Sequence, residues 1–130
     1  MAKLNKLNFA EEAEKVIKSL QYENRRGDMI INITSSKIRN MLAMSNNLYN
    51  AVMKDRTPEL SEDIRSSIQY IKMKFAYEAG REKNVNEFVN KANLMKHIDE
   101  IGSSREQALI FCKYMESLVA YHRFHSGRDR

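Results

Sequence analysis

The sequence has 130 residues, the usual length of one domain and enough chain to bury a hydrophobic core. Lysine and arginine outnumber aspartate and glutamate by 22 to 17, and this net charge of +5 permits an anionic partner without requiring one. The single cysteine excludes an internal disulfide, and no apolar run approaches the roughly 20 residues of a membrane span. We therefore expect one domain, residues 1–130, in a cytoplasmic protein without a membrane partner.

The composition favours helices along the whole chain. There are only one proline and four glycines, and the alternation of polar and apolar residues that is typical of strands is almost absent. Residues 29–33 are the only β-like run, and we interpret them as an apolar connector. The predicted fold class is all-α, a compact bundle of about five helices. Residues 1–7 and 126–130 are expected to be flexible.

The first two helices are separated by a polar connector. Asn8 and Glu11 have the spacing of a capping box, which predicts a first helix that ends near Leu20. Residues 23–34 form the connector, where we expect disorder or exchange of the first helix between protomers. The run Thr34, Ser35 and Ser36 is the predicted cap of a second helix that extends to about Lys54.

Three further helices follow from capping signals. Thr57 followed by Pro58 is typical of a helix start, and Gly80 is the expected end of that third helix. A fourth helix is predicted from a capping pair at residues 84 and 87 as far as Gly102. A serine at 103 or 104 then opens a fifth helix that ends near Gly127.

The third helix carries two apolar stripes. One runs from Leu60 to Ala79, and the nearly opposite one contains Tyr70, Met73 and Tyr77. Two interpretations of the second stripe remain open. Aromatic stripes at helical spacing usually pack in a core. Alternatively, the phenol rings and the neighbouring cations form a face for nucleic acid, a polyanion that carries flat rings.

Lys37 and Arg39 lie in the first turn of the second helix, where the helix dipole does not favour positive charge. With Ser35, Ser36 and the free backbone amides they would form a phosphate site; ordinary solvated side chains are the alternative. Further cations gather near the ends of the second and third helices and in the C-terminal tail: Lys54, Arg56, Lys72, Lys74, Arg81, Lys83, Arg123, Arg128 and Arg130.

The residues needed for catalysis or metal binding are missing from the sequence. His122 and His125 have helical spacing, but no carboxylate or cysteine at ligand spacing joins them. Cys112 lies on the apolar arc of the fifth helix and is expected in the core. No glycine-rich phosphate loop occurs. We predict no catalytic residue, no metal site and no cofactor.

Three local patterns occur in order along the chain. Residues 36–39 (SKIR) open a helix, residues 74–81 read KFAYEAGR, and residues 116–122 read ESLVAYH. Together they resemble the small subunit of the Csm complex, the type III-A CRISPR effector, over roughly residues 34–127. The resemblance implies a non-catalytic subunit in antiviral defence that is present in several copies and self-associates along a filament. Its implied partners are the other Csm effector subunits, CRISPR RNA and target RNA, chiefly the target strand.

The resemblance also assigns roles to residues. Lys37, Arg39 and Arg81 match cations of the family patterns and are the first predicted RNA contacts. Charge and position add Lys72, Lys74 and Arg123 to the predicted RNA-binding set. Two alternatives remain: a helical protein–protein adaptor without nucleic-acid contact, which uses the stripe of Tyr70, Met73 and Tyr77, and a small enzyme completed by a cofactor or a partner.

Overall fold

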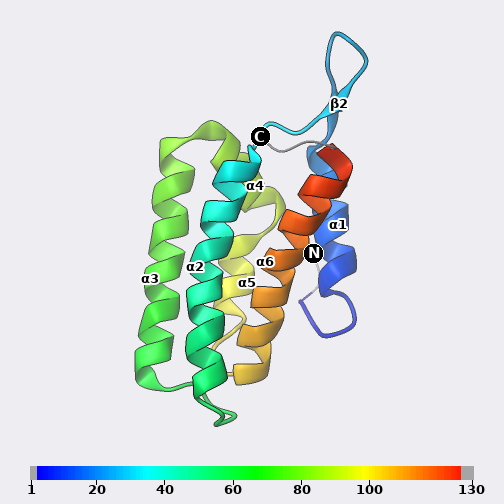
Figure 1. The fold of residues 1–130 in the computed structure, drawn as a ribbon. Helices are drawn as coiled ribbons and strands as arrows, with labels where there is room; N and C mark the ends of the chain where they lie inside the picture. The colour runs from blue at the N-terminus through cyan, green and yellow to red at the C-terminus, as the bar shows by residue number, and fades with distance from the viewer. Residues whose placement is uncertain (1–2, 127–130) are drawn as a thin grey trace.

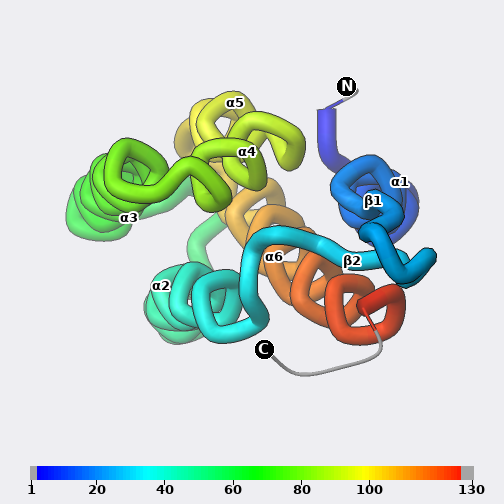
Figure 2. The backbone as a smooth tube through the Cα atoms, turned by 90° about the horizontal axis from the view of Figure 1, so that it is seen from above, coloured from blue at the N-terminus to red at the C-terminus, as the bar shows by residue number. Residues whose placement is uncertain are grey.

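The computed structural model describes residues 3–126, which form six α-helices and one two-stranded hairpin (Figure 1). The all-α prediction is therefore confirmed, with six described helices in place of about five. Helix α6 lies in the middle and packs against α1 and α2, whereas α3 packs chiefly on α4 (Figure 2). The elements are α1 Phe9–Leu20, β1 Tyr22–Glu23, β2 Met29–Ile30, α2 Ser35–Lys54, α3 Glu62–Arg81, α4 Lys83–Lys91, α5 Leu94–Asp99 and α6 Arg105–Ser126.

Side-chain caps fix where the long helices α2 and α6 begin. The Thr34 hydroxyl accepts a hydrogen bond from the Lys37 amide at 3.2 Å, as the sequence predicts for α2. Ser104 does the same for α6, with a distance of 3.0 Å to the amide of Gln107. At the other end of α2, the Arg105 guanidinium donates to the carbonyl of Asp55 at 2.9 Å. The start of α6 is thus tied to the end of α2.

The N-terminal region differs from the prediction in two respects. The Asn8 side chain does not cap α1; its Oδ1 accepts from the Asn5 amide at 2.8 Å, so the capping box is wrong. Leu4, within the segment expected to be flexible, is buried and its carbonyl accepts from Gln107 at 2.8 Å, whereas Leu7 of the same segment is exposed. Residues 1–2 and 127–130 of the two expected flexible ends lie outside the described part of the chain, and Ser126 belongs to α6.

The connector contains a β-hairpin that projects from one end of the bundle (Figure 1). Tyr22 pairs with Ile30 and Glu23 with Met29 in antiparallel register, so the first two residues of the run 29–33 form a strand and the interpretation of the run as an apolar connector is wrong there. Gly27 closes the turn with a φ of +82°, a conformation that suits glycine. Helix α1 packs against α6 of its own chain in this structure.

The third helix starts later than the sequence predicts. Its N-cap is Ser61, whose hydroxyl accepts from the Ile64 amide at 3.2 Å, and it ends at Arg81 with Gly80 inside it. The Pro58 carbonyl instead accepts from the Arg105 amide at 3.0 Å. This bond and an isolated antiparallel bridge between Glu59 and Ser104 pair the segment with the residues before α6, which the local helix signals could not reveal.

The predicted fourth helix is two helices, α4 and α5. Asn93 separates them with a φ of 55°, in the left-handed region that asparagine tolerates better than most residues. Asn84 lies within the first turn of α4, whose N-cap position is Glu82, so the predicted cap is wrong. The break turns α5 so that it contacts α3.

The core lies around α6. The largest fully buried side chains include Tyr114, Phe75, Phe88 and Phe111. His122 donates from Nε2 to the carbonyl of Ile33 at 2.8 Å, which joins the segment after the hairpin to α6. Of the helices within residues 3–126, none has the length and hydrophobicity that a bilayer crossing needs.

Candidate nucleic-acid interface

Three helix ends meet at the same end of the bundle as the hairpin. Helix α2 begins there, and α3 and α6 end there, because α2 runs antiparallel to the other two (Figure 1). This arrangement brings Lys37 and Arg39 of α2 to the same end as Arg81 of α3 and Arg123 of α6. We call these four residues the basic end. Residues separated by more than 80 positions in the sequence therefore gather at one end of the molecule.

Two cations of the basic end lie on α2: Lys37 has a partner outside this helix, and Arg39 has its partner within it. The Lys37 ammonium lies 2.6 Å from a carboxylate oxygen of Glu82, and about a third of each side chain is exposed. Arg39 folds back along its own helix and donates to the carbonyl and the hydroxyl of Ser35, each at 3.3 Å. Because Ser35 is buried and occupied by Arg39, it is a support for the guanidinium and not an open part of a phosphate site.

Arg81 has two neighbours on α3. Its guanidinium forms an ion pair with Glu78 at 3.3 Å and lies over the ring of Tyr77, 5.5 Å from the ring centre. Both arginine and tyrosine are exposed. The carboxylate lowers the net positive charge at this position, whereas the stacked ring holds the guanidinium at the surface.

The two lysines of α3 have different partners. Lys72 forms an ion pair with Asp99 at the end of α5, with 2.7 Å between Nζ and Oδ1. Lys74 lies over the ring of Tyr70 at 5.7 Å and lines a groove between α3 and α2. Lys72 is thus paired away from the basic end, and Lys74 lines the groove.

The three residues of the second α3 stripe are exposed. Tyr70, Met73 and Tyr77 have exposed fractions of 59%, 54% and 60%. The core side of α3 carries Ile64, Ile68, Ile71 and Phe75 instead. Of the two interpretations, packing in the core of this chain is therefore wrong, and the stripe forms a surface.

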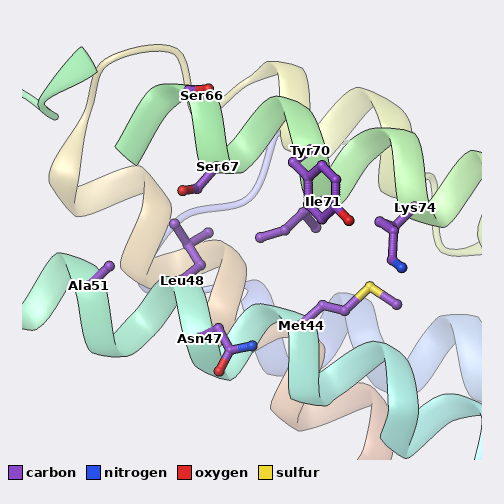
Figure 3. Close-up of a pocket in the computed structure, with 9 residues that line it drawn as sticks. All are labelled: Met44, Asn47, Leu48, Ala51, Ser66, Ser67, Tyr70, Ile71 and Lys74. Atoms are coloured by element: carbon purple, nitrogen blue, oxygen red, sulfur yellow. The ribbon is translucent and has the colours of Figure 1, made fainter. Parts of the chain in front are cut away.

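A groove of about 490 Å³ lies between α2 and α3 (Figure 3). It exists because α3 packs mainly on α4 and touches α2 along only part of its length. Sequence reasoning missed it; the available signal was a set of small and polar side chains beside the apolar stripes of both helices. Its lining residues are Met44, Asn47, Leu48, Ala51, Ser66, Ser67, Tyr70, Ile71 and Lys74.

Titratable groups in the interior have structural partners. His97 lies 2.9 Å from a carboxylate oxygen of Glu100 and contacts the ring of Tyr114 edge-on. His125 lies 2.9 Å from Glu14 of α1. Burial raises the pKa of the Cys112 thiol to about 12, which leaves it protonated at neutral pH. Within residues 3–126, no three histidine, cysteine or acidic side chains are grouped so that they could hold a metal ion.

Comparison with known proteins gives a consistent result. Residues 8–128 match the family described as Csm2 Type III-A. A protein named CRISPR system Cms protein Csm2 from Enterococcus italicus is 37% identical over 127 residues, which cover 95% of this chain and 91% of that one. The Streptococcus thermophilus protein of that name is 36% identical over 129 residues, with 99% and 100% covered. One from Mycobacterium tuberculosis is 33% identical over 98 residues, with 75% and 79% covered.

Proposed function

Because this chain belongs to the Csm2 type III-A family, we propose that it is the non-catalytic small subunit of a type III-A CRISPR effector complex. In this proposal, copies stack along a filament beside the other effector subunits. The basic end contacts the sugar–phosphate backbone of the paired guide and target RNA, chiefly the target strand. The role belongs to antiviral defence in the cytoplasm, and target cleavage is performed by other subunits.

The observation that carries the proposal is that Lys37, Arg39, Arg81 and Arg123 lie on helix ends at the same end of the bundle. Helix α2 has no acidic residue in its first turn, so its positive dipole end is not neutralised from within the helix. Free backbone amides and cations at a helix start favour phosphate. A subunit that follows RNA of arbitrary sequence must contact the backbone and recognise shape, since the guide changes while the protein does not.

A single copy needs only weak affinity. Stacking supplies a high effective concentration, so that many weak contacts hold one RNA strand. Contacts to phosphate release counterions and are therefore sensitive to salt. We accordingly expect the free chain to bind RNA poorly and the assembled complex to bind it strongly.

The test is a reconstituted effector complex that carries Lys37→Glu, Arg39→Glu and Arg81→Glu together. We expect unchanged helicity and melting of the free chain, with loss of target RNA binding by the complex. The matched control reverses three exposed lysines of α1, α4 and α5: Lys18, Lys91 and Lys96. Target binding equal to that of the control would remove the site assignment.

A second function has an observation in its favour. Tyr70, Met73 and Tyr77 form an exposed stripe, and exposed aromatic residues are frequent anchors of protein interfaces. In a purely protein–protein adaptor, Tyr77→Ala would weaken association while high salt would scarcely affect it. The RNA-contacting subunit predicts the reverse sensitivity: strong dependence on salt, with the cations of the basic end as the decisive residues.

A further inference from the structure

A ring–cation pair occurs twice on α3 at a spacing of seven residues. Lys74 lies over Tyr70 at 5.7 Å, and Arg81 lies over Tyr77 at 5.5 Å. Seven residues make almost two helical turns, so the two pairs lie on the same side of α3, about 10 Å apart along its axis. Each pair places a flat apolar ring next to a positive charge at the surface.

The first pair opens onto the groove between α2 and α3. In Figure 3, Tyr70 and Lys74 of α3 and Met44 of α2 extend into the space between the two helices. Leu48 and Ile71 provide further apolar lining, and Asn47 adds an amide with hydrogen-bond donors and an acceptor. Among the described lining residues, Lys74 is the only charged one.

This lining suits one chemical class best. An apolar surface beside a tyrosine accepts a planar ring, an amide can pair with the polar edge of that ring, and an ammonium group accepts a phosphate. With no carboxylate among the lining residues, the charge of the groove favours an anion. A nucleotide has all three features. A base can enter such a groove only when it is unpaired, because the bases of a duplex are stacked inside it.

We propose that the groove between α2 and α3 binds one unpaired nucleotide of single-stranded RNA. The base lies against Met44 and beside the Tyr70 ring, over the almost fully buried Leu48 and Ile71, and its phosphate is bound by Lys74. The Tyr77–Arg81 pair contacts a neighbouring nucleotide of the same strand. This inference rests on the proposed contact with RNA and adds a groove for single-stranded RNA that adjoins the basic end at Arg81.

The test is an NMR titration of the full chain with a single-stranded uridine hexanucleotide, taken to millimolar concentration because binding is weak. We expect shifts of the amide signals of Asn47, Ser67, Tyr70 and Lys74. A blunt RNA duplex of the same length should leave these signals in place. Absence of groove shifts with the single strand, or equal shifts with both RNAs, would overturn the inference.

Variants of Tyr70 test whether its aromatic ring itself contributes to RNA binding. Tyr70→Leu keeps an apolar side chain but removes the ring, and should weaken hexanucleotide binding by about tenfold. Tyr70→Phe keeps the ring and should bind almost as tightly as the parent chain. Tyr49→Leu is the matched control, since Tyr49 is an exposed tyrosine of α2 outside this groove. Equal affinity of Tyr70→Leu and Tyr49→Leu would sink the proposed site.

The groove and the proposed function can fail separately. If the basic-end triple variant abolishes target binding while the hexanucleotide leaves the groove signals unchanged, only the groove inference is lost. If the triple variant binds target normally but the groove still responds to the single strand, the basic-end assignment is lost. Protection of the groove by other effector subunits without RNA would show that it is a protein interface, which overturns the inference.

Discussion

Lys37 of α2 and Glu82, the residue between α3 and α4, form an ion pair with 2.6 Å between Nζ and Oε2. The pair joins the beginning of one long helix to the end of another at the basic end. Both side chains are partly exposed, and ion pairs in such settings contribute only about 0.2–1 kcal/mol. A phosphate group could therefore replace the carboxylate with little loss of folding free energy. The pair positions Lys37, and in the proposed complex Glu82 would compete with the RNA phosphate for its ammonium group.

This competition predicts opposite effects for two conservative substitutions. Lys37→Gln should weaken target RNA binding by the assembled complex, because one phosphate contact is lost. Glu82→Gln should strengthen binding, because it releases the ammonium from its carboxylate. Affinities measured over a series of salt concentrations check both, and the salt slope should become shallower by about one for each copy of Lys37→Gln that contacts the RNA. Weakened binding by both variants would mean that the pair acts only as a structural link.

A second prediction concerns the break between α4 and α5. Asn93 has a φ of 55°, where a side chain with a Cβ is strained. Asn93→Ala should therefore lower the free energy of unfolding by about 1 kcal/mol, whereas Asn93→Gly should leave it equal or higher. Urea unfolding followed by circular dichroism measures both. The same stability for both variants would contradict a role of the left-handed conformation.

A third prediction concerns a buried hydrogen bond in the core. The Tyr114 hydroxyl donates to the carbonyl of Ala92 at 2.8 Å, and Tyr114 is fully buried. Tyr114→Phe leaves this carbonyl without its partner, which should cost about 1–3 kcal/mol of unfolding free energy. The exposed Tyr49→Phe provides the control, with an expected change near zero. A loss confined to Tyr49→Phe, or none in Tyr114→Phe, would show that the bond contributes nothing.

The sequence predicts those elements whose start is determined locally. Thr34 caps α2 as expected, and Ser104 caps α6, because a side-chain hydroxyl three residues before a free amide is a local interaction. The start of α3 could not be predicted this way. Pro58 has a favourable local pattern for a helix, but its carbonyl bonds to Arg105, which is distant in the sequence. A long-range contact overrides the local signal there.

The candidate site was predictable only in part. The sequence gives the charge of Lys37, Arg39, Arg81 and Arg123, and the antiparallel packing of the helices places them at one end of the bundle. Glu82, the acidic partner of Lys37, lies far from it in the sequence. The spacing of residues along the chain therefore does not indicate that the two side chains meet. The groove between α2 and α3 depends on how far two helices separate, which is a property of packing against α4 and α6.

The last prediction concerns stability at alkaline pH. Burial raises the pKa of Cys112 from 9.0 to about 12, and its thiol lies 3.4 Å from the Ser45 carbonyl, to which it can donate. Above pH 9 the unfolded chain releases this proton while the folded chain retains it. The unfolded state then binds fewer protons, so the free energy of unfolding falls as pH rises. This contribution is complete below pH 9 and is lost progressively towards pH 12.

The size of the effect can be measured against a variant without the thiol. Between pH 8 and 10.5, Cys112 should account for about 2 kcal/mol of the decline in unfolding free energy. Cys112→Ala removes this titration, so its stability should decline less steeply over the same range, even though the smaller side chain lowers stability at neutral pH. Urea unfolding at several pH values gives both curves. Parallel curves would show that this thiol ionises at the same pH in the folded and unfolded chains, and that burial does not raise its pKa.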